Sequence, residues 1–395
     1  MSAQVFLAVT LWATGASAQG WTYENISALE PGVDAVQVVV ESSGERMWFA
    51  YGGKDPVDGV PNALHVRSWD PSGWRPDHVV STGYEGYPDM AYLPTLLVRP
   101  DAMVMVRRTL AGGHHELVED VFPMVGPSYH RLADFYQPNH NVGHNKGMLV
   151  LGQYYNGIED RIRMCSRVED PAMGDEVYCS ERAADDMTPD AWREPHVNIS
   201  GMVAADQDHV GQAFRNDFPI TVYASAIDGT EDREILMLSD ETGELTTVAS
   251  EVGAYIDRPH IAADENTTYV VYHHRGSEDD GSQVWMATRP ASGGAWSHEQ
   301  VSDALDRASD ASIVVAGNEI YVVYKQDDYI DIATRCIDDP AWSRETVDSL
   351  AGVESVLTAK LPLNVSDRGV HVVYSREDGG QMVARWAKRD RISCP

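Results

Sequence analysis

The sequence predicts an all-β protein, a seven-bladed β-propeller built from four-stranded antiparallel blades. A strand-like run recurs at intervals of about fifty residues, and between the runs a Trp repeatedly precedes a Val by five residues. One further copy of that second pattern, Trp21 to Ile26, stands alone at the start of the chain, while the last unit has none. A ring closed by the N-terminal strand explains both facts.

The recurring run is rich in β-branched and aromatic residues and is bounded by Gly, Asn, Asp and Ser, as strands are. We take it as the second strand of each blade and the Trp–Val pattern as the outermost strand. The last aromatic position of the run falls at Tyr51, Arg107, Tyr154, Tyr223, Tyr272, Tyr324 and Tyr374, and the outer pattern begins at Trp74, Trp192, Trp296 and Trp342. A β-sandwich or two smaller β domains are the alternatives, but neither accounts for the isolated Trp21 segment.

The N-terminus carries the pattern of a secretory signal peptide. Residues 4–14 are mostly apolar, and Ala16-Ser17-Ala18 forms a small-residue cleavage site before Gln19. We therefore expect a signal peptide at 1–18, a single propeller domain at 19–395 with its N-terminal strand at about 21–26, and secretion to an extracellular or periplasmic space. No other apolar run is long enough to span a membrane.

Four cysteines suit an oxidising compartment. Cys165 and Cys179 flank a local segment, and a bond between Cys336 and Cys394 would tie down the C-terminal tail. Four cysteines allow three pairings, so the pattern does not choose among them. No Cys or His spacing indicates zinc. We expect no required cofactor, although acidic turns such as Asp279-Asp280 offer the oxygen ligands that calcium prefers.

The chain is strongly acidic, with 61 Asp and Glu against 30 Lys and Arg and a formal net charge of −31. Such a surface repels nucleic acid and anionic membranes, and it favours a soluble monomer. We therefore expect neither nucleic acid nor an anionic membrane as a partner.

Cationic and His residues recur at one place in the predicted blades. The start of each first strand and the end of each second strand meet at one mouth of the propeller channel. First-strand starts supply His140, His209, Arg258 and His260. Second-strand ends supply Lys54, Arg107, Arg108, Tyr155, His273, His274, Arg275, Lys325 and Arg376, and Arg215 is a further candidate. Such a ring would attract an anionic ligand, and Arg binds carboxylate or sulfate with two hydrogen bonds. The alternative is that these are solvated loop residues that neutralise nearby acids, as Lys54 would neutralise Asp55.

A short motif carries a family resemblance. Ser277-Glu278-Asp279-Asp280-Gly281, with Gln283 and Trp285 after it, approaches the Asp-box pattern Ser-x-Asp-x-Gly-x-Thr-Trp. On this motif and its repeats, the chain resembles the sialidase-like, or BNR (Asp-box), propeller superfamily, over nearly all of 19–395. Sialidases of that class carry an Arg-Ile-Pro motif and six blades, so the resemblance does not favour sialidase activity. The architecture also resembles the propeller-type polysaccharide lyases, including ulvan lyases, and this resemblance implies cleavage of an acidic polysaccharide.

Three functions fit these features. The first is β-elimination on a uronate polysaccharide, with Arg258 or Arg215 neutralising the carboxylate, His140 or His260 as base and Tyr155 as acid or base. The second is glycoside hydrolysis, which needs two carboxylates; the candidates are Asp217, Asp257, Asp327 and Glu377. The third is a propeller that binds glycan or protein without catalysis. We favour an enzyme of the first kind.

Overall fold

The computed structural model describes residues 20–27, 36–43, 45–53, 63–75, 78–80, 95–100, 102–111, 114–123, 129–132, 149–170, 174–186, 192, 197–199, 207–227, 232–276, 281–303, 307–349, 363–378, 380–392 and 394. The predicted signal peptide at 1–18 lies outside them. Among the described residues, no helix is long and apolar enough to cross a membrane.

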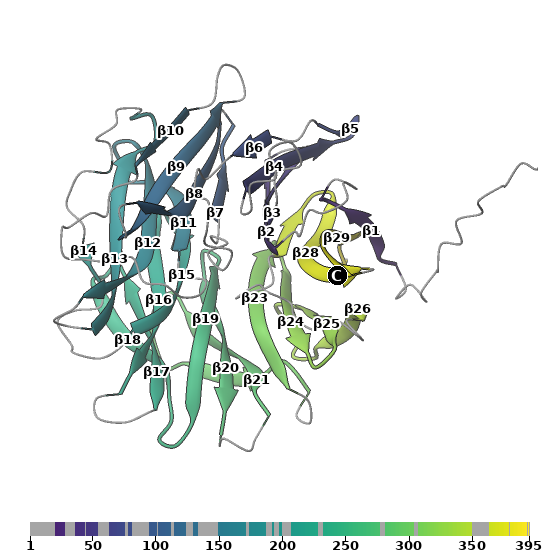
Figure 1. The fold of residues 1–395 in the computed structure, drawn as a ribbon. Helices are drawn as coiled ribbons and strands as arrows, with labels where there is room; N and C mark the ends of the chain where they lie inside the picture. Colours follow the sequence, from purple (N-terminus) through teal and green to yellow (C-terminus); the bar gives the residue numbers. More distant parts are fainter. Residues whose placement is uncertain are drawn as a thin grey trace, which may run out of the picture.

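Seven antiparallel sheets surround a common axis (Figure 1). The first three sheets contain β2 (Val36–Ser43), β3 (Arg46–Gly53), β4 (Ala63–Asp70), β5 (Gly73–Trp74) and β6 (His78–Val80); β7 (Thr95–Val98), β8 (Ala102–Ala111), β9 (His114–Pro123) and β10 (Tyr129–Leu132); and β11 (Leu149–Tyr155), β12 (Asp160–Asp170), β13 (Gly174–Ala183) and β14 (Val197–Asn198).

The other four sheets contain β15 (Gln207–Arg215), β16 (Phe218–Ala226), β17 (Arg233–Ser239) and β18 (Glu244–Ser250); β19 (Tyr255–Ala263), β20 (Thr267–Arg275), β21 (Gln283–Pro290) and β22 (Ser297–Gln300); β23 (Ala308–Ala316), β24 (Glu319–Gln326), β25 (Tyr329–Cys336) and β26 (Ser343–Ser349); and β27 (Leu363–Ser366), β28 (Gly369–Asp378), β29 (Gln381–Arg389) and β1 (Thr22–Asn25). The predicted seven-bladed, all-β fold is confirmed.

The first strand of each sheet lines the axis. Contacts run from β2 through β7, β11, β15, β19 and β23 to β27, and from β27 back to β2. The second strands are almost wholly buried, as β16 and β24 show, because each blade is covered on both faces by its neighbours. Their sequences are therefore near-continuous apolar runs instead of alternating ones.

The hydrophobic core is divided among the interfaces between blades. The described residues form seven buried clusters, one at each contact between neighbouring sheets. Each cluster joins side chains from two blades, so no blade buries its apolar faces alone. This is why the fold needs the whole ring of repeats.

The N-terminal strand joins the last blade. β1 pairs with β29, from Thr22 opposite Lys388 to Asn25 opposite Arg385, and Figure 1 shows the purple β1 beside the yellow β29. Trp21 is buried in the cluster between the sixth and seventh sheets, whereas Ile26 is buried between the seventh and the first. That this strand is what holds the ring closed stays a prediction.

Both cysteine pairs form disulfides. Cys165 and Cys179 face each other directly on β12 and β13, and Cys336 on β25 is bonded to Cys394 in the C-terminal tail. Two disulfides suit an oxidising compartment.

Candidate functional site

Three consecutive innermost strands carry a bulge at the same place. His209 on β15, Arg258 on β19 and Asp310 on β23 have φ angles of 49°, 52° and 57°, and the pairing register shifts beside each of them. A left-handed backbone at a residue other than glycine costs about 1–3 kcal/mol and is concentrated at functional sites. All three bulges lie near the strand starts, at one mouth of the channel.

Each bulged residue on the fourth and fifth blades reaches the next blade. His209 Nδ1 lies 3.0 Å from Asp257 Oδ1, and Arg258 Nη1 lies 2.5 Å from Asp310 Oδ1. Asp310 also accepts a hydrogen bond of 3.0 Å from the Ser309 hydroxyl. The result is a line of charged groups that crosses two blade boundaries.

A tyrosine and two further arginines extend this line. The Tyr255 hydroxyl donates to Asp257 Oδ2 at 3.0 Å, and Arg233 lies 3.5 Å from the other oxygen of that carboxylate. The guanidinium groups of Arg233 and Arg275 lie 5.5 Å and 5.1 Å from the centre of the Tyr255 ring. Together with His273 and Lys325 these residues form what we call the mouth cluster, which consists of His209, Arg233, Tyr255, Asp257, Arg258, His273, Arg275, Asp310 and Lys325.

His273 is the most deeply buried histidine of the cluster. It is directly opposite Asp257 on the neighbouring strand, is 6% exposed, and its Nε2 has no hydrogen-bond partner among the described residues. Burial, and then the charge of Arg258, lowers the pKa of His273 to about 3. At neutral pH this imidazole is therefore uncharged.

The two buried carboxylates have opposite electrostatic environments. Burial would raise the pKa of Asp257, but the hydrogen bond and charge of His209 and the charge of Arg233 outweigh it and hold that pKa far below its usual range. At Asp310 burial dominates over the charges of Arg258 and Lys325, and the pKa is raised. Groups whose environments push their pKa values apart are suited to acid and base roles.

Several predicted site residues lie within this cluster. His209, Arg258, His273, Arg275 and Lys325 are all members of it, although their roles remain proposals. The positions of His140 and Lys54 lie outside the described residues, as does the acidic turn at Asp279-Asp280.

Arg107 and Arg108 lie inside β8, which continues to Ala111, so they are not at a strand end as predicted. Their side chains are outside what the structure describes.

Two predicted catalytic candidates lie at the opposite face of the ring. Tyr155 ends β11, which is the first strand of its sheet and not the second, and Arg215 ends the first strand β15. The ends of first strands point away from the mouth at which those strands start. Asp217, in the turn after β15, lies at this far face too. Tyr155 is therefore not at the mouth as predicted, and the candidates Arg215 and Asp217 lie with it at the far face.

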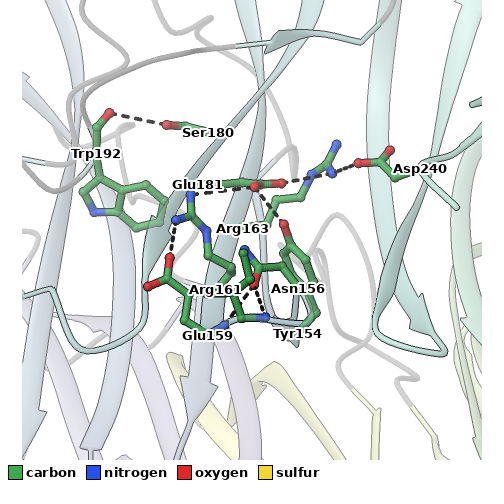
Figure 2. Close-up of polar contacts among 10 residues, drawn as sticks. Tyr154, Asn156, Glu159, Arg161, Arg163, Ser180, Glu181, Trp192 and Asp240 are labelled. Carbon is green, nitrogen blue, oxygen red and sulfur yellow. Dashed lines mark hydrogen bonds and ion pairs between the residues drawn. The ribbon is translucent and has the colours of Figure 1, made fainter.

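The far face of the third blade is occupied by an ion-pair network (Figure 2). Arg163, buried on β12, lies between Glu181 and Asp240 and pairs with both, and the Tyr154 hydroxyl donates to Glu181 at 2.7 Å. The neighbouring Arg161 pairs with Glu159 at 2.8 Å. Both arginines are matched by carboxylates, and Arg163 joins the third blade to Asp240 of the fourth.

Three other predicted residues have contacts between blades. His260 Nδ1 accepts a hydrogen bond of 3.1 Å from the backbone N–H of Ile313 on the next innermost strand. His274 pairs with Glu251 at 2.8 Å, and Arg376 pairs with Asp348 at 2.9 Å. His260 lies two residues beyond Arg258, so it is not equivalent to His209 as a bulge residue.

Sequence reasoning missed Tyr255, Arg233 and Asp310 as site residues. The first strand of the fifth blade was predicted to start near Arg258 and His260, whereas β19 begins at Tyr255. The alternation of polar side chains in Tyr255-Ile256-Asp257 is the signal that would have extended the strand. Among the described residues, no group of three or more His, Cys, Asp and Glu side chains is arranged to hold a metal ion.

Solved structures share this architecture. The polysaccharide lyase Uly1 has a TM-score of 0.58 at 8% identity, over 92% of this chain and 91% of that chain. The β-propeller domain of the Trilobed protease from Pyrococcus furiosus has a TM-score of 0.52 at 8% identity, over 90% and 95%. A sialidase from Trypanosoma rangeli, with a TM-score of 0.48 at 9% identity over 94% and 60%, is too distant to carry an argument.

These likenesses show the fold alone. They confirm the architectural resemblance to a propeller-type polysaccharide lyase. Of the first two structures, one is of a polysaccharide lyase and the other is of a domain of a protease. No protein-family model and no curated protein sequence matches this chain.

Proposed function

We propose that this protein is a secreted enzyme that cleaves an anionic, uronate-containing polysaccharide by β-elimination at the channel mouth. The observation that carries the proposal is the mouth cluster itself. Within it, the cations Arg233, Arg258, Arg275 and Lys325 outnumber the carboxylates of Asp257 and Asp310. In a chain with a formal charge of −31, this local excess of positive charge favours an anionic ligand.

The cluster holds the groups that β-elimination needs. Arg258, with a side chain 32% exposed, would neutralise the uronate carboxylate and so acidify the C5 proton. His209, oriented by Asp257, is the candidate base that removes this proton, and Tyr255 is the candidate acid. The C4–O4 bond then breaks, a double bond forms between C4 and C5, and the acid gives a proton to the leaving O4.

One observation favours a second candidate, glycoside hydrolysis. The pKa of Asp310 is raised and that of Asp257 is lowered, and this difference is the one that separates a general acid from a carboxylate base. Hydrolysis would give new reducing ends without an unsaturated product.

The test is an incubation of the purified protein with a panel of uronate and sulfated polysaccharides, following absorbance near 235 nm and reducing ends. A rise in both supports the lyase, and we expect His209→Asn to lower kcat by roughly 10²–10⁴-fold. Asparagine tolerates the left-handed backbone at this position. Arg161→Gln, a change of charge at the far face, is the matched control. Reducing ends alone would favour hydrolysis, and no product with saturable binding would favour a binding propeller.

A further inference from the structure

Four of the five recurring outer-strand tryptophans join neighbouring blades through a glutamate. The indole N–H of Trp342 donates to Glu299 at 3.2 Å, and that of Trp21 donates to Glu345 at 3.2 Å. The same bond joins Trp74 to Glu24 at 3.0 Å and Trp192 to Glu119 at 2.9 Å. We call this arrangement the Trp–Glu clasp.

An arginine completes each clasp. Guanidinium groups lie 4.7–5.3 Å from the ring centres of Trp74, Trp342, Trp21 and Trp192. In three of these clasps the same arginine pairs with the clasp glutamate: Arg335 with Glu299, Arg389 with Glu345 and Arg182 with Glu119. The clasp therefore satisfies a buried donor and pairs a carboxylate at the same time.

The fifth tryptophan, Trp296, lacks this acceptor. Glu299, Glu345 and Glu24 occupy the same register position on outermost strands, opposite Met286, Ile332 and Trp386. On β18 the equivalent place, opposite Met237, is taken by Thr246.

As a result, the Trp296 indole N–H is buried with no hydrogen-bond partner among the described residues. Arg289 still lies 5.8 Å from the ring centre, but it pairs with Glu244 at 3.1 Å.

A groove lies at this incomplete clasp. It has a volume of about 500 Å³ and runs between β18 of the fourth blade and the outer strands of the fifth. Trp285, Trp296, Tyr272, His274 and His298 contribute rings to its lining, and Glu251 contributes a carboxylate. The volume is within the range of roughly 300–1,000 Å³ that is typical of small-molecule sites.

The lining suits a sugar ring. A pyranose has one face of C–H groups, which packs on an indole or imidazole ring, and hydroxyl groups at its edge that donate to a carboxylate. The Glu251 side chain is 62% exposed, so its carboxylate is accessible to such hydroxyls. The same negative charge repels a uronate or a sulfate, so the groove differs in preference from the mouth cluster.

We propose that this groove binds a neutral saccharide unit, at a site separate from the channel mouth. Trp285 and Trp296 are the stacking surfaces, and Glu251 accepts hydrogen bonds from the sugar hydroxyls. The proposal does not depend on the reaction at the mouth, because no residue of the mouth cluster lines the groove.

Calorimetric titration and tryptophan fluorescence with neutral oligosaccharides test this. The probes are cellohexaose, xylohexaose, mannohexaose and maltohexaose. Choline is titrated separately, because aromatic rings also bind small cations. The variants are Glu251→Ala, in which an exposed side chain is removed, and Trp285→Ala. Glu265→Ala, an equal change of charge in the exposed turn after β19, is the matched control.

We expect saturable binding of at least one oligosaccharide, weakened tenfold or more by Glu251→Ala and by Trp285→Ala and unchanged by Glu265→Ala. Circular dichroism of each variant identifies any loss of fold, and Glu251→Ala carries the test if Trp285→Ala does not fold. Millimolar oligosaccharide without binding, binding that both variants leave unchanged, or binding of choline alone would each overturn the proposal.

Discussion

Three residues at the channel mouth adopt a backbone conformation that costs free energy. His209, Arg258 and Asp310 occupy equivalent places on neighbouring innermost strands, each with a φ near 50°. The bulge turns His209 and Arg258 to carboxylates on the next blade. A strain repeated three times in one place is retained because the surrounding structure outweighs it, and it supports a functional role for this mouth.

The buried histidines predict how stability depends on pH. The pKa values of His273 and His371 are lowered by burial to about 3 and about 4, whereas the unfolded chain binds these protons near pH 6.5. The folded state therefore holds fewer protons between those values, and stability falls as pH is lowered from 6.5 towards 4. Removing His273 by His273→Gln should reduce that slope by about 1.4 kcal/mol per pH unit.

Thermal denaturation of the natural protein and of His273→Gln from pH 4 to pH 8 measures how the free energy of unfolding depends on pH. The groups that face His273 are Asp257, Arg258 and His209, and Asp257 keeps its charge throughout this range because its pKa is depressed. An equal slope in the variant and the natural protein would contradict the assignment of a buried, neutral imidazole.

At the scale of the strand, the recurring Trp–Val pattern is explained by contacts between blades. Four of the five tryptophans donate to a glutamate of another blade, and the Val301 and Val347 side chains at the other end of the pattern are fully buried. The pattern therefore recurs because each blade must be joined to the one before it. Trp296 occupies the same position in its blade, but its indole N–H has no hydrogen-bond acceptor among the described residues.

The incomplete clasp makes a prediction about stability. Thr246→Glu supplies the missing acceptor for the Trp296 N–H and a second partner for Arg289. A hydrogen bond to a charged group contributes about 1.5–3 kcal/mol at most, so we expect a higher Tm by a few degrees. Differential scanning calorimetry checks it.

The complementary experiment removes the glutamate of a complete Trp–Glu clasp in the neighbouring blade. Glu299→Ala leaves Trp342 and Arg335 without their shared carboxylate, and it should lower Tm, whereas Asp338→Ala in an exposed turn should not. A neutral or destabilising Thr246→Glu beside a destabilising Glu299→Ala would show that the fifth blade does not need the clasp.

For the whole molecule, stability depends on seven interfaces arranged in a circle. Each buried cluster belongs to two blades, and the innermost strands contact one another around the entire ring. Trp21 and Ile26, at the two ends of β1, pack into the interfaces on either side of the seventh blade. β1 therefore contributes buried side chains to both interfaces of the seventh blade.

We therefore expect the N-terminal strand to be required for a closed ring. Trp21→Ala removes a side chain that is 3% exposed and should lower stability by about 3–5 kcal/mol. The loss would be measured as a lower Tm together with faster proteolysis at the junction. Thr22→Ala, an exposed neighbour on the same strand, is the control. A Tm equal to that of the control would mean that the ring closes without this strand.

The period of the repeats and the isolated Trp21 segment were sufficient to predict the seven blades and the sheet that β1 joins. Local pattern failed at the third blade, because Tyr154-Tyr155 ends an apolar run in a first strand just as other tyrosines end second strands. The two kinds of run therefore look alike in local composition. Only the pairing of β11 with β12 distinguishes them, and that pairing moves Tyr155 to the other face.

The architecture follows from the sequence alone, because the apolar period, the turn residues and the outer tryptophans are local features that repeat. The sequence also indicated that His209, Arg258 and His273 lie at one mouth, because strand starts and ends alternate in a regular order. The pairing of His209 with Asp257, the pairing of Arg258 with Asp310 and the contact of Tyr255 with Asp257 became visible in the folded structure. The first two contacts cross blade boundaries between residues about fifty positions apart, and the bulges that orient the side chains depend on the packing of neighbouring strands.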